Sequence, residues 1–194
     1  MRIHPLSKLI KLSNSQGIAR RFFVTNGFDG ALTMIGLFMG FFLSEGATIP
    51  VATQACLGAA IALFMSGFTS AYISESAERE KEITELENAM SKDLSDTVHG
   101  RAAKTIPVLV ALVNGLSPLF ISLFIMIPLW LSLAGVVIPG NVFLWSIGLS
   151  CAAIFVLGVY LSTISQQHWF ISGLKALSIA GMTLLVISLV GDVR

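Results

Sequence analysis

An aspartate, Asp29, lies about seven residues inside an apolar run that begins at Phe22, or ~10 Å along a helix. No other acidic residue lies within an apolar run long enough to cross a membrane. Acidic side chains at such depth are costly and usually face a cavity or a partner. Asn26, Asp29 and Thr33 share one helical face, which predicts a polar, pore-lining stripe. The alternative is a carboxyl group that is protonated in place or hydrogen-bonded to a neighbouring helix.

A second group of carboxylates follows a later apolar run, where six of the seven glutamates occur within thirteen residues. The segment lacks Gly and Pro, so it is expected to continue the preceding helix. An arc of about 80° holds four of the glutamates, namely Glu75, Glu78, Glu82 and Glu85. Divalent cations prefer carboxylate oxygens, and two such stripes facing each other would hold several ions. Equally consistent is an ordinary solvated helix, in which nearby Lys and Arg side chains offset the acids.

Sulfur and hydroxyl groups also lie inside the apolar runs. Met34 and Met39 are in the first run and Met65 is in the second, close to Ser66 and Ser70. A thioether beside carboxylates favours a transition metal over calcium or magnesium, so Met65 is a candidate metal ligand and Ser66 and Ser70 are candidate pore-lining residues. The alternative for the methionines is ordinary packing in an apolar helix.

Two pairs of glycines in the first run allow close approach of another helix. Gly27 and Gly30 flank Asp29, and they would admit either a neighbouring helix or a hydrated ion. Gly36 and Gly40 form a GxxxG motif, which permits close helix contact within a subunit or between two.

Composition excludes several classes of protein. The chain has 194 residues, of which 55% are hydrophobic and 12% are charged, about half the charge of a typical soluble domain. Its mean hydropathy is +0.83. Cys56 and Cys151 lie in apolar runs without metal or disulfide spacing. No phosphate-binding loop, histidine cluster or activated serine is present, and nothing suggests nucleic-acid binding or an enzyme.

The elements that position these residues are transmembrane helices, because a bilayer core takes ~20 apolar residues of helix to cross. The sequence predicts an all-α integral membrane protein with five spans, at Phe22–Leu43, Val51–Ile73, Ile106–Leu131, Val142–Thr163 and Ile171–Val190. The third span is long and contains Pro118 and Pro128, so it is expected to be kinked, tilted or ended early near Pro128.

Lys and Arg placement predicts the orientation. Ten basic residues fall before the first span or between the second and third, and Lys175, near the start of the fifth span, fits a short loop on the same side, whereas only Arg194 falls on the other side. The N-terminus is therefore expected in the cytoplasm and the C-terminus outside. The chain then divides into a basic cytoplasmic segment (1–21), two spans (22–73), a cytoplasmic glutamate-rich segment (74–104) and three further spans (105–194).

The N-terminal segment lacks the apolar core and cleavage site of a signal peptide. Its residues 3–12 alternate apolar and basic side chains, which indicates either an amphipathic helix at the membrane surface or a basic flank that fixes topology. A compact chain of this kind suits a prokaryotic plasma membrane.

Several of these motifs resemble the vacuolar iron transporter family. The run Asn26-Gly-Phe-Asp29-Gly-Ala-Leu-Thr33 is similar to the signature that opens the family's first helix. The segment from Gly58 to Ser74, followed by glutamates, resembles its second helix and the start of its metal-binding domain. At positions 67 and 71 the chain has Gly67 and Ala71, where the family pattern has Met and Glu.

The resemblance implies a homodimer with an ion path between the two first helices. It further implies exchange of cytosolic ferrous iron, or of manganese, cobalt or zinc, for protons. In this reading Asp29 binds metal when ionised and releases it when protonated, and the glutamates collect metal at the pore entrance. The ion is a substrate and no cofactor is expected. Two other classes stay open: a membrane-bound metal sensor or buffer without transport, and a transporter of another substrate.

Overall fold

The computed structural model describes residues 15–44, 46–95, 97–165 and 168–191. These residues form six helices and no strand: α2 (Ser15–Leu43), α3 (Ile49–Met90), α4 (Val98–Ile125), α5 (Ile127–Leu133), α6 (Val142–Ser165) and α7 (Trp169–Gly191). Five of them, all but the seven-residue α5, are long and apolar enough to cross a membrane. For the described residues, the prediction of an all-α protein with five helices that could span a membrane is confirmed. The segment 3–12 lies outside the described residues.

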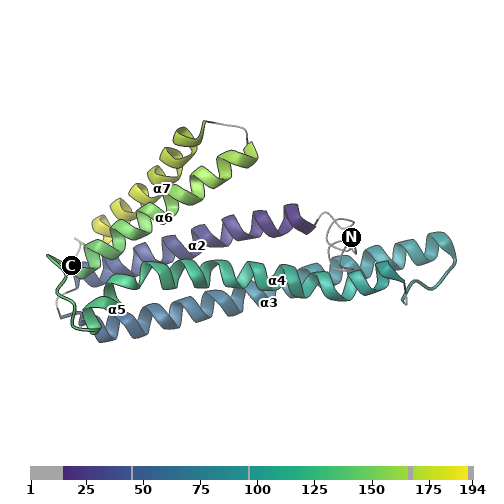
Figure 1. Ribbon diagram of the computed structural model, residues 1–194, viewed down its shortest axis with the longest axis horizontal. Helices are drawn as coiled ribbons and strands as arrows, with labels where there is room; N and C mark the ends of the chain where they lie inside the picture. Colours follow the sequence, from purple (N-terminus) through teal and green to yellow (C-terminus); the bar gives the residue numbers. More distant parts are fainter. Residues whose placement is uncertain (1–14, 45, 96, 166–167, 192–194) are drawn as a thin grey trace, which may run out of the picture.

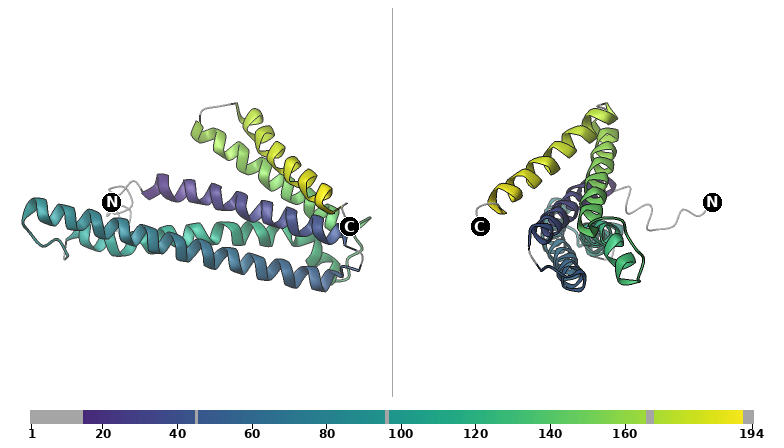
Figure 2. Two further views of the ribbon diagram at one scale, coloured as in Figure 1. Left: turned by 180° about the vertical axis from the view of Figure 1, so that it is seen from behind. Right: turned by 90° about the vertical axis from the view of Figure 1, so that its left-hand side faces the viewer.

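Helices α2, α3 and α4 run side by side, and α6 and α7 form a hairpin that leans on α2 (Figure 1). Figure 2 shows from two further sides that this hairpin lies near α2 at the end where α5 lies, and diverges from it toward the α6–α7 turn. Helix α3 packs mainly against α4 and only slightly against α2. Helix α2 is therefore the central element, with α4 on one side and the hairpin on the other.

Glycines set the closest contacts between these helices. A Cβ atom at Gly30 would lie 2.9 Å from both the Cα atom and the carbonyl oxygen of Pro118. At Gly115 of α4 it would lie 2.7 Å from the carbonyl oxygen of Phe64 on α3. Backbone atoms cannot yield to such contacts, so both helix pairs require glycine here. By contrast, a Cβ atom at Gly40 would meet nothing within 4 Å in the part of the chain that the structure describes.

The core of the membrane-spanning part is formed by α2 and the faces packed on it. Met34, Ile35 and Phe38 are fully buried, together with Cys56 of α3 and Ile154 of α6. Met34 thus has a packing role, whereas Cys56 and the half-buried Cys151 are free thiols.

The third apolar run is divided between two helices. Helix α4 continues through Pro107 and Pro118 but ends at Ile125, six residues before the predicted end at Leu131. Pro128 has no backbone N–H, so it cannot continue the hydrogen bonding of α4, and it occupies the first turn of α5 instead. The sequence allowed a kink, a tilt or an early end near Pro128, and the structure shows the early end.

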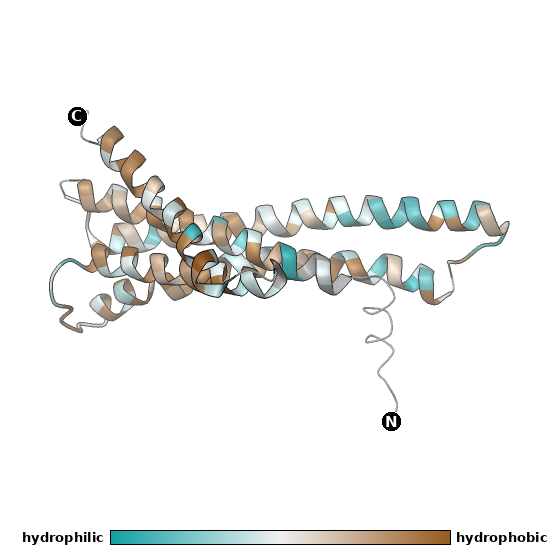
Figure 3. Ribbon diagram, turned by 90° about the horizontal axis from the view of Figure 1, so that it is seen from above, coloured by the Kyte–Doolittle hydropathy of each residue, from teal (hydrophilic) through white to brown (hydrophobic). Residues whose placement is uncertain are grey.

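Helix α3 is a single helix of 42 residues whose second half carries the glutamates. This half extends past the start of α2 with the beginning of α4 beside it, and hydrophilic residues gather there (Figure 3). The turn after α3 is closed by Glu87, whose side chain accepts the backbone N–H of Leu94 at 2.9 Å. Thr97 then caps α4 by accepting the N–H of Gly100 at 3.3 Å.

Candidate ion-binding sites

Asp29 lies on an exposed face of α2, not in a contact between helices. It lines a cavity of about 500 Å³ together with Arg20, Arg21, Thr25 and Leu161, which places the cavity between α2 and α6. The Asp29 carboxyl group makes no hydrogen bond or ion pair with any residue that the structure describes. The side chain is thus accessible to a ligand, to water or to a second protein surface, and two arginines share its cavity.

Asn26 and Thr33, the other members of the predicted polar stripe, have different surroundings. The Asn26 amide donates to the carbonyl oxygen of Phe22 at 3.0 Å and to Oδ1 of Asn114 on α4. Thr33 is half-buried. The structure therefore joins Asn26 to α4, while Asp29, one turn further along, faces the cavity.

A polar cross-link that the sequence did not predict connects α2, α3 and α4. Besides accepting from Asn26, buried Asn114 donates its amide to the carbonyl oxygen of Gly67 on α3 at 2.6 Å. One turn along α4, the Ser117 hydroxyl donates to the carbonyl oxygen of Phe23 on α2 at 2.5 Å. The available signal was a polar residue, Asn114, in the middle of a predicted span, since such residues in membranes seek partners across helices.

Helix α3 leaves the side chains of its candidate ligands exposed. Ser66, Ser70 and Met65 are exposed, the last by 53%. Gly67 and Ala71, at the positions where the vacuolar iron transporter pattern has Met and Glu, are instead buried. A Cβ atom at Gly67 would lie 3.2 Å from the carbonyl oxygen of Asn114 and 3.3 Å from the Cα atom of Gly115. The α3–α4 contact thus leaves no room for a long side chain at position 67.

The glutamate stripe is divided by Arg79. Its guanidinium group contacts the Glu75 carboxylate at 2.7 Å and the Glu82 carboxylate at 2.8 Å. The Arg79 and Glu75 side chains are only 12% and 11% exposed, so this pair is packed against the protein. Glu78 and Glu85 are exposed and form no ion pair within the described residues. Two carboxylates of the stripe are therefore neutralised within the helix and two are available.

Within the described part of the chain, no three His, Cys, Asp or Glu residues come together as a metal site. Asp29 and the glutamates lie on different helices, and the two available carboxylates of the stripe, Glu78 and Glu85, are seven residues, or ~10 Å, apart along α3. A metal ion bound at any one of these carboxylates would thus need its other ligands from water or from another chain.

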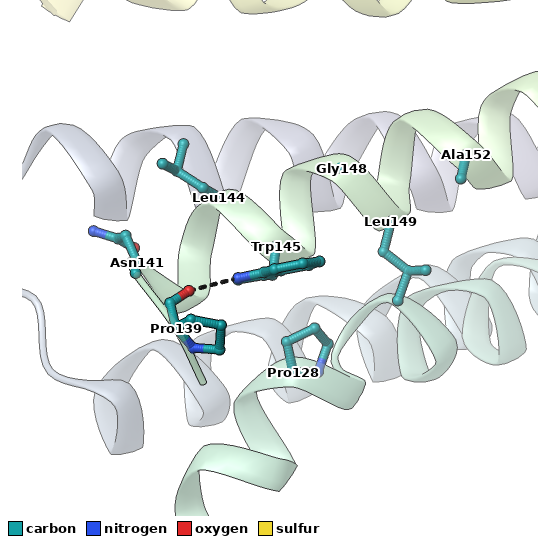
Figure 4. Close-up of a pocket in the computed structure, with 9 residues that line it drawn as sticks. Pro128, Pro139, Asn141, Leu144, Trp145, Gly148, Leu149 and Ala152 are labelled. Atoms are coloured by element: carbon teal, nitrogen blue, oxygen red, sulfur yellow. Dashed lines mark hydrogen bonds between the residues drawn. The ribbon is translucent and has the colours of Figure 1, made fainter. Parts of the chain in front are cut away.

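A further cavity of about 520 Å³ lies between α5 and α6 (Figure 4). Its lining is almost entirely apolar, and the Nε1 atom of Trp145 donates to the carbonyl oxygen of Pro139 at 2.8 Å at its edge. No ionisable residue lines this cavity, so it offers nothing to hold a cation.

The chain is distantly similar to an archaeal protein. No protein-family model matches the chain, and no solved structure matches it. The "Uncharacterized protein MJ0645" of Methanocaldococcus jannaschii is 28% identical over 173 residues. The match covers 88% of this chain and 86% of the archaeal protein, so the similarity extends along nearly the whole of both sequences.

Proposed function

We propose that this chain carries a divalent metal ion out of the cytosol in exchange for protons, with ferrous iron as the first candidate and manganese as the second. The observation that supports it most directly is Asp29, an ionisable side chain in a membrane-spanning helix with no partner among the described residues. A carboxyl group in that position needs a cavity, an ion or a proton to offset its cost. Exchange of a metal ion for a proton meets this need in both states.

The glutamate-bearing half of α3 has a supporting role in this proposal. Positive-inside placement of the basic residues puts this half and the N-terminus in the cytoplasm, in a membrane that we take to be a prokaryotic plasma membrane. Glu78 and Glu85 would then attract cations to the cytoplasmic surface, since both are exposed and unpaired within the described chain.

A homodimer completes the proposal. Because Asp29 is exposed in a single chain, a second copy packed over its cavity would bring a second carboxylate and close the path on the side that one chain leaves open. Two such carboxylates with water match the oxygen ligands that divalent cations prefer.

A second candidate is a membrane-bound metal sensor or buffer that transports nothing. One observation favours it: Arg20 and Arg21 line the same cavity as Asp29, and their positive charges oppose the entry of a cation. In that case the glutamates of α3 are the metal site, and Asp29 is a structural carboxyl group.

Flux measurements on proteoliposomes separate the two functions. Purified protein is reconstituted, and uptake of Fe²⁺, Mn²⁺, Co²⁺ and Zn²⁺ is followed with and without a pH gradient. We expect gradient-dependent flux that Asp29→Asn lowers by at least about tenfold, the factor for a loss of 1.4 kcal/mol. Asp93→Asn, which changes an exposed aspartate after α3, is the control and should keep the wild-type rate. Transport through this site is contradicted if none of these metals is taken up, or if Asp29→Asn leaves the uptake rate unchanged.

Titration of the purified protein with a metal ion tests the second function, that of a sensor or buffer. Glu78→Gln with Glu85→Gln should weaken Mn²⁺ binding, whereas Glu80→Gln, on another face of α3, should change it little. Metal binding lost in the double variant, together with absent flux, would establish the sensor or buffer. Unchanged affinity in both variants would return the stripe to an ordinary solvated helix.

A further inference from the structure

We propose that an anionic phospholipid binds in a groove between α2 and the α6–α7 hairpin, with its phosphate at Arg20 and Arg21 and an acyl chain along Phe28 and Leu161. This binding does not depend on whether the protein transports an ion.

The groove consists of two adjoining cavities. The first, of about 500 Å³, contains Arg20, Arg21 and Asp29. The second, of about 420 Å³, is lined by α2, α6 and α7. Phe28 and Leu161 line both cavities, so the two meet along these side chains. In Figures 1 and 2 the hairpin diverges from α2 toward the α6–α7 turn.

Basic groups lie at one end of this groove and apolar groups along it. Arg20 and Arg21 are both exposed near the start of the first span, where a lipid headgroup would lie. Arg21 is already held on one side, with its guanidinium carbon 5.7 Å from the centre of the Phe22 ring. The Thr25 hydroxyl shares the first cavity, and Ser172 and Lys175 line the second. Basic pockets between membrane helices on the cytoplasmic side are typical sites for anionic headgroups.

The walls favour a lipid over a free phosphate. Beyond the arginines the groove is lined mainly by Val24, Phe28, Leu32, Leu161 and Ile179. Leu161 is 42% exposed in the span of α6, so the groove opens to the surface that meets the bilayer. An apolar groove open to a bilayer is filled by an acyl chain, because water there would find few hydrogen-bond partners.

Asp29 is the one acidic group in the groove. It lies eight residues beyond Arg21 on the same helix, which is ~12 Å along the axis. A phosphate bound at the level of Arg21 would thus lie about two helical turns from this carboxylate. The phosphate would also cancel the positive charge at the mouth of the cavity, which is the feature that opposes cation entry.

Native mass spectrometry of the full chain tests the site. Delipidated protein is titrated with phosphatidylglycerol and, separately, with phosphatidylcholine. We expect tighter binding of phosphatidylglycerol, and Arg20→Gln with Arg21→Gln should weaken it about 30-fold, from about a factor of five for each basic side chain near the headgroup. The matched control is Arg101→Gln with Lys104→Gln, which removes two exposed charges from the start of α4 and should leave binding within about twofold. An unchanged melting temperature in phosphatidylcholine confirms that each variant is folded.

Each other outcome overturns the proposal. Equal losses in the two double variants would mean general attraction to charge, and no loss in the first would exclude the arginines. Displacement of the lipid by glycerol 3-phosphate at similar concentration would show a phosphate site that needs no acyl chain. Binding that survives the arginine changes but disappears on deletion of residues 1–13 would place the lipid at the basic N-terminal segment. Because the readout is bound lipid, failure here is distinct from failure of metal flux.

Discussion

Replacing Asn114 with leucine removes the cross-link between α2, α3 and α4. Leucine has the branched shape of asparagine, with methyl groups in place of the amide oxygen and nitrogen, so the change deletes the hydrogen bonds and adds a little volume at a buried position. Two bonds are lost, one to the Gly67 carbonyl oxygen and one from the Asn26 amide. Hydrogen bonds between membrane helices are worth about 0.6 kcal/mol on average and 1.7 at most. The free energy of unfolding should therefore fall by about 1–3 kcal/mol.

The measurement is unfolding of the protein in mixed micelles with increasing SDS, followed by tryptophan fluorescence. Thr183→Val is the control, because the exposed Thr183 hydroxyl donates only to the carbonyl oxygen of Ile179 in its own helix. A double-mutant cycle with Asn26→Val isolates the bond between the two asparagines, with an expected coupling of about 1 kcal/mol. A loss for Asn114→Leu no larger than that of the control, with no coupling to Asn26, would refute the cross-link.

Three further changes have definite expected outcomes. Gly30→Leu should destabilise the protein by about 1–3 kcal/mol or more in the same SDS assay, since its side chain would collide with the backbone of α4, whereas Gly40→Leu should have little effect. Arg79→Gln releases two carboxylates of the stripe and should raise the Mn²⁺ affinity measured by calorimetry about fivefold; an equal or weaker affinity would contradict the ion-pair account. Hydrogen bonds from Ser95 hold the pKa of Asp93 below its ordinary range. The ionised carboxylate therefore stabilises the turn at pH values above the ordinary pKa, and this stabilisation is lost as the pH falls through the lowered pKa. The protection factor of the Ser95 amide, which is its exchange rate relative to the intrinsic rate at the same pH, should then fall on acidification, and a protection factor that does not change with pH would contradict the assignment.

The fold was predictable where one physical quantity decides it. Apolar length alone located five spanning helices, and the absence of Gly and Pro predicted that the second would continue through the glutamates. The end of the third span was less certain because Pro118 and Pro128 look alike in sequence. Pro118 is accommodated where α4 meets Gly30, whereas α4 ends just before Pro128.

The candidate site was less predictable because contacts between helices have no local signature. Asn26 and Asn114 are 88 residues apart, so spacing along one helix grouped Asn26 with Asp29 and not with its actual partner. The periodicity placed four glutamates on one face of α3, but it did not show that Arg79 would pair with two of them. Likewise, Gly27 and Gly30 were consistent with either a helix or an ion nearby, and the structure places α4 against both.

The continuity of α3 has a mechanical consequence. From Phe68 to Met90 the helix contains no Gly or Pro, the usual points at which a helix bends, so its glutamate-bearing half is joined to the Gly67 turn as one stiff rod. At 1.5 Å per residue this rod is ~35 Å long. A torque applied at Glu78 therefore turns Gly67 through the same angle, and the Asn114 amide, fixed to the Gly67 carbonyl oxygen, must stretch or follow. A rotation of the glutamate-bearing half of α3 is thereby transmitted to the Gly67–Asn114 contact between the spanning helices, with no hinge between the two.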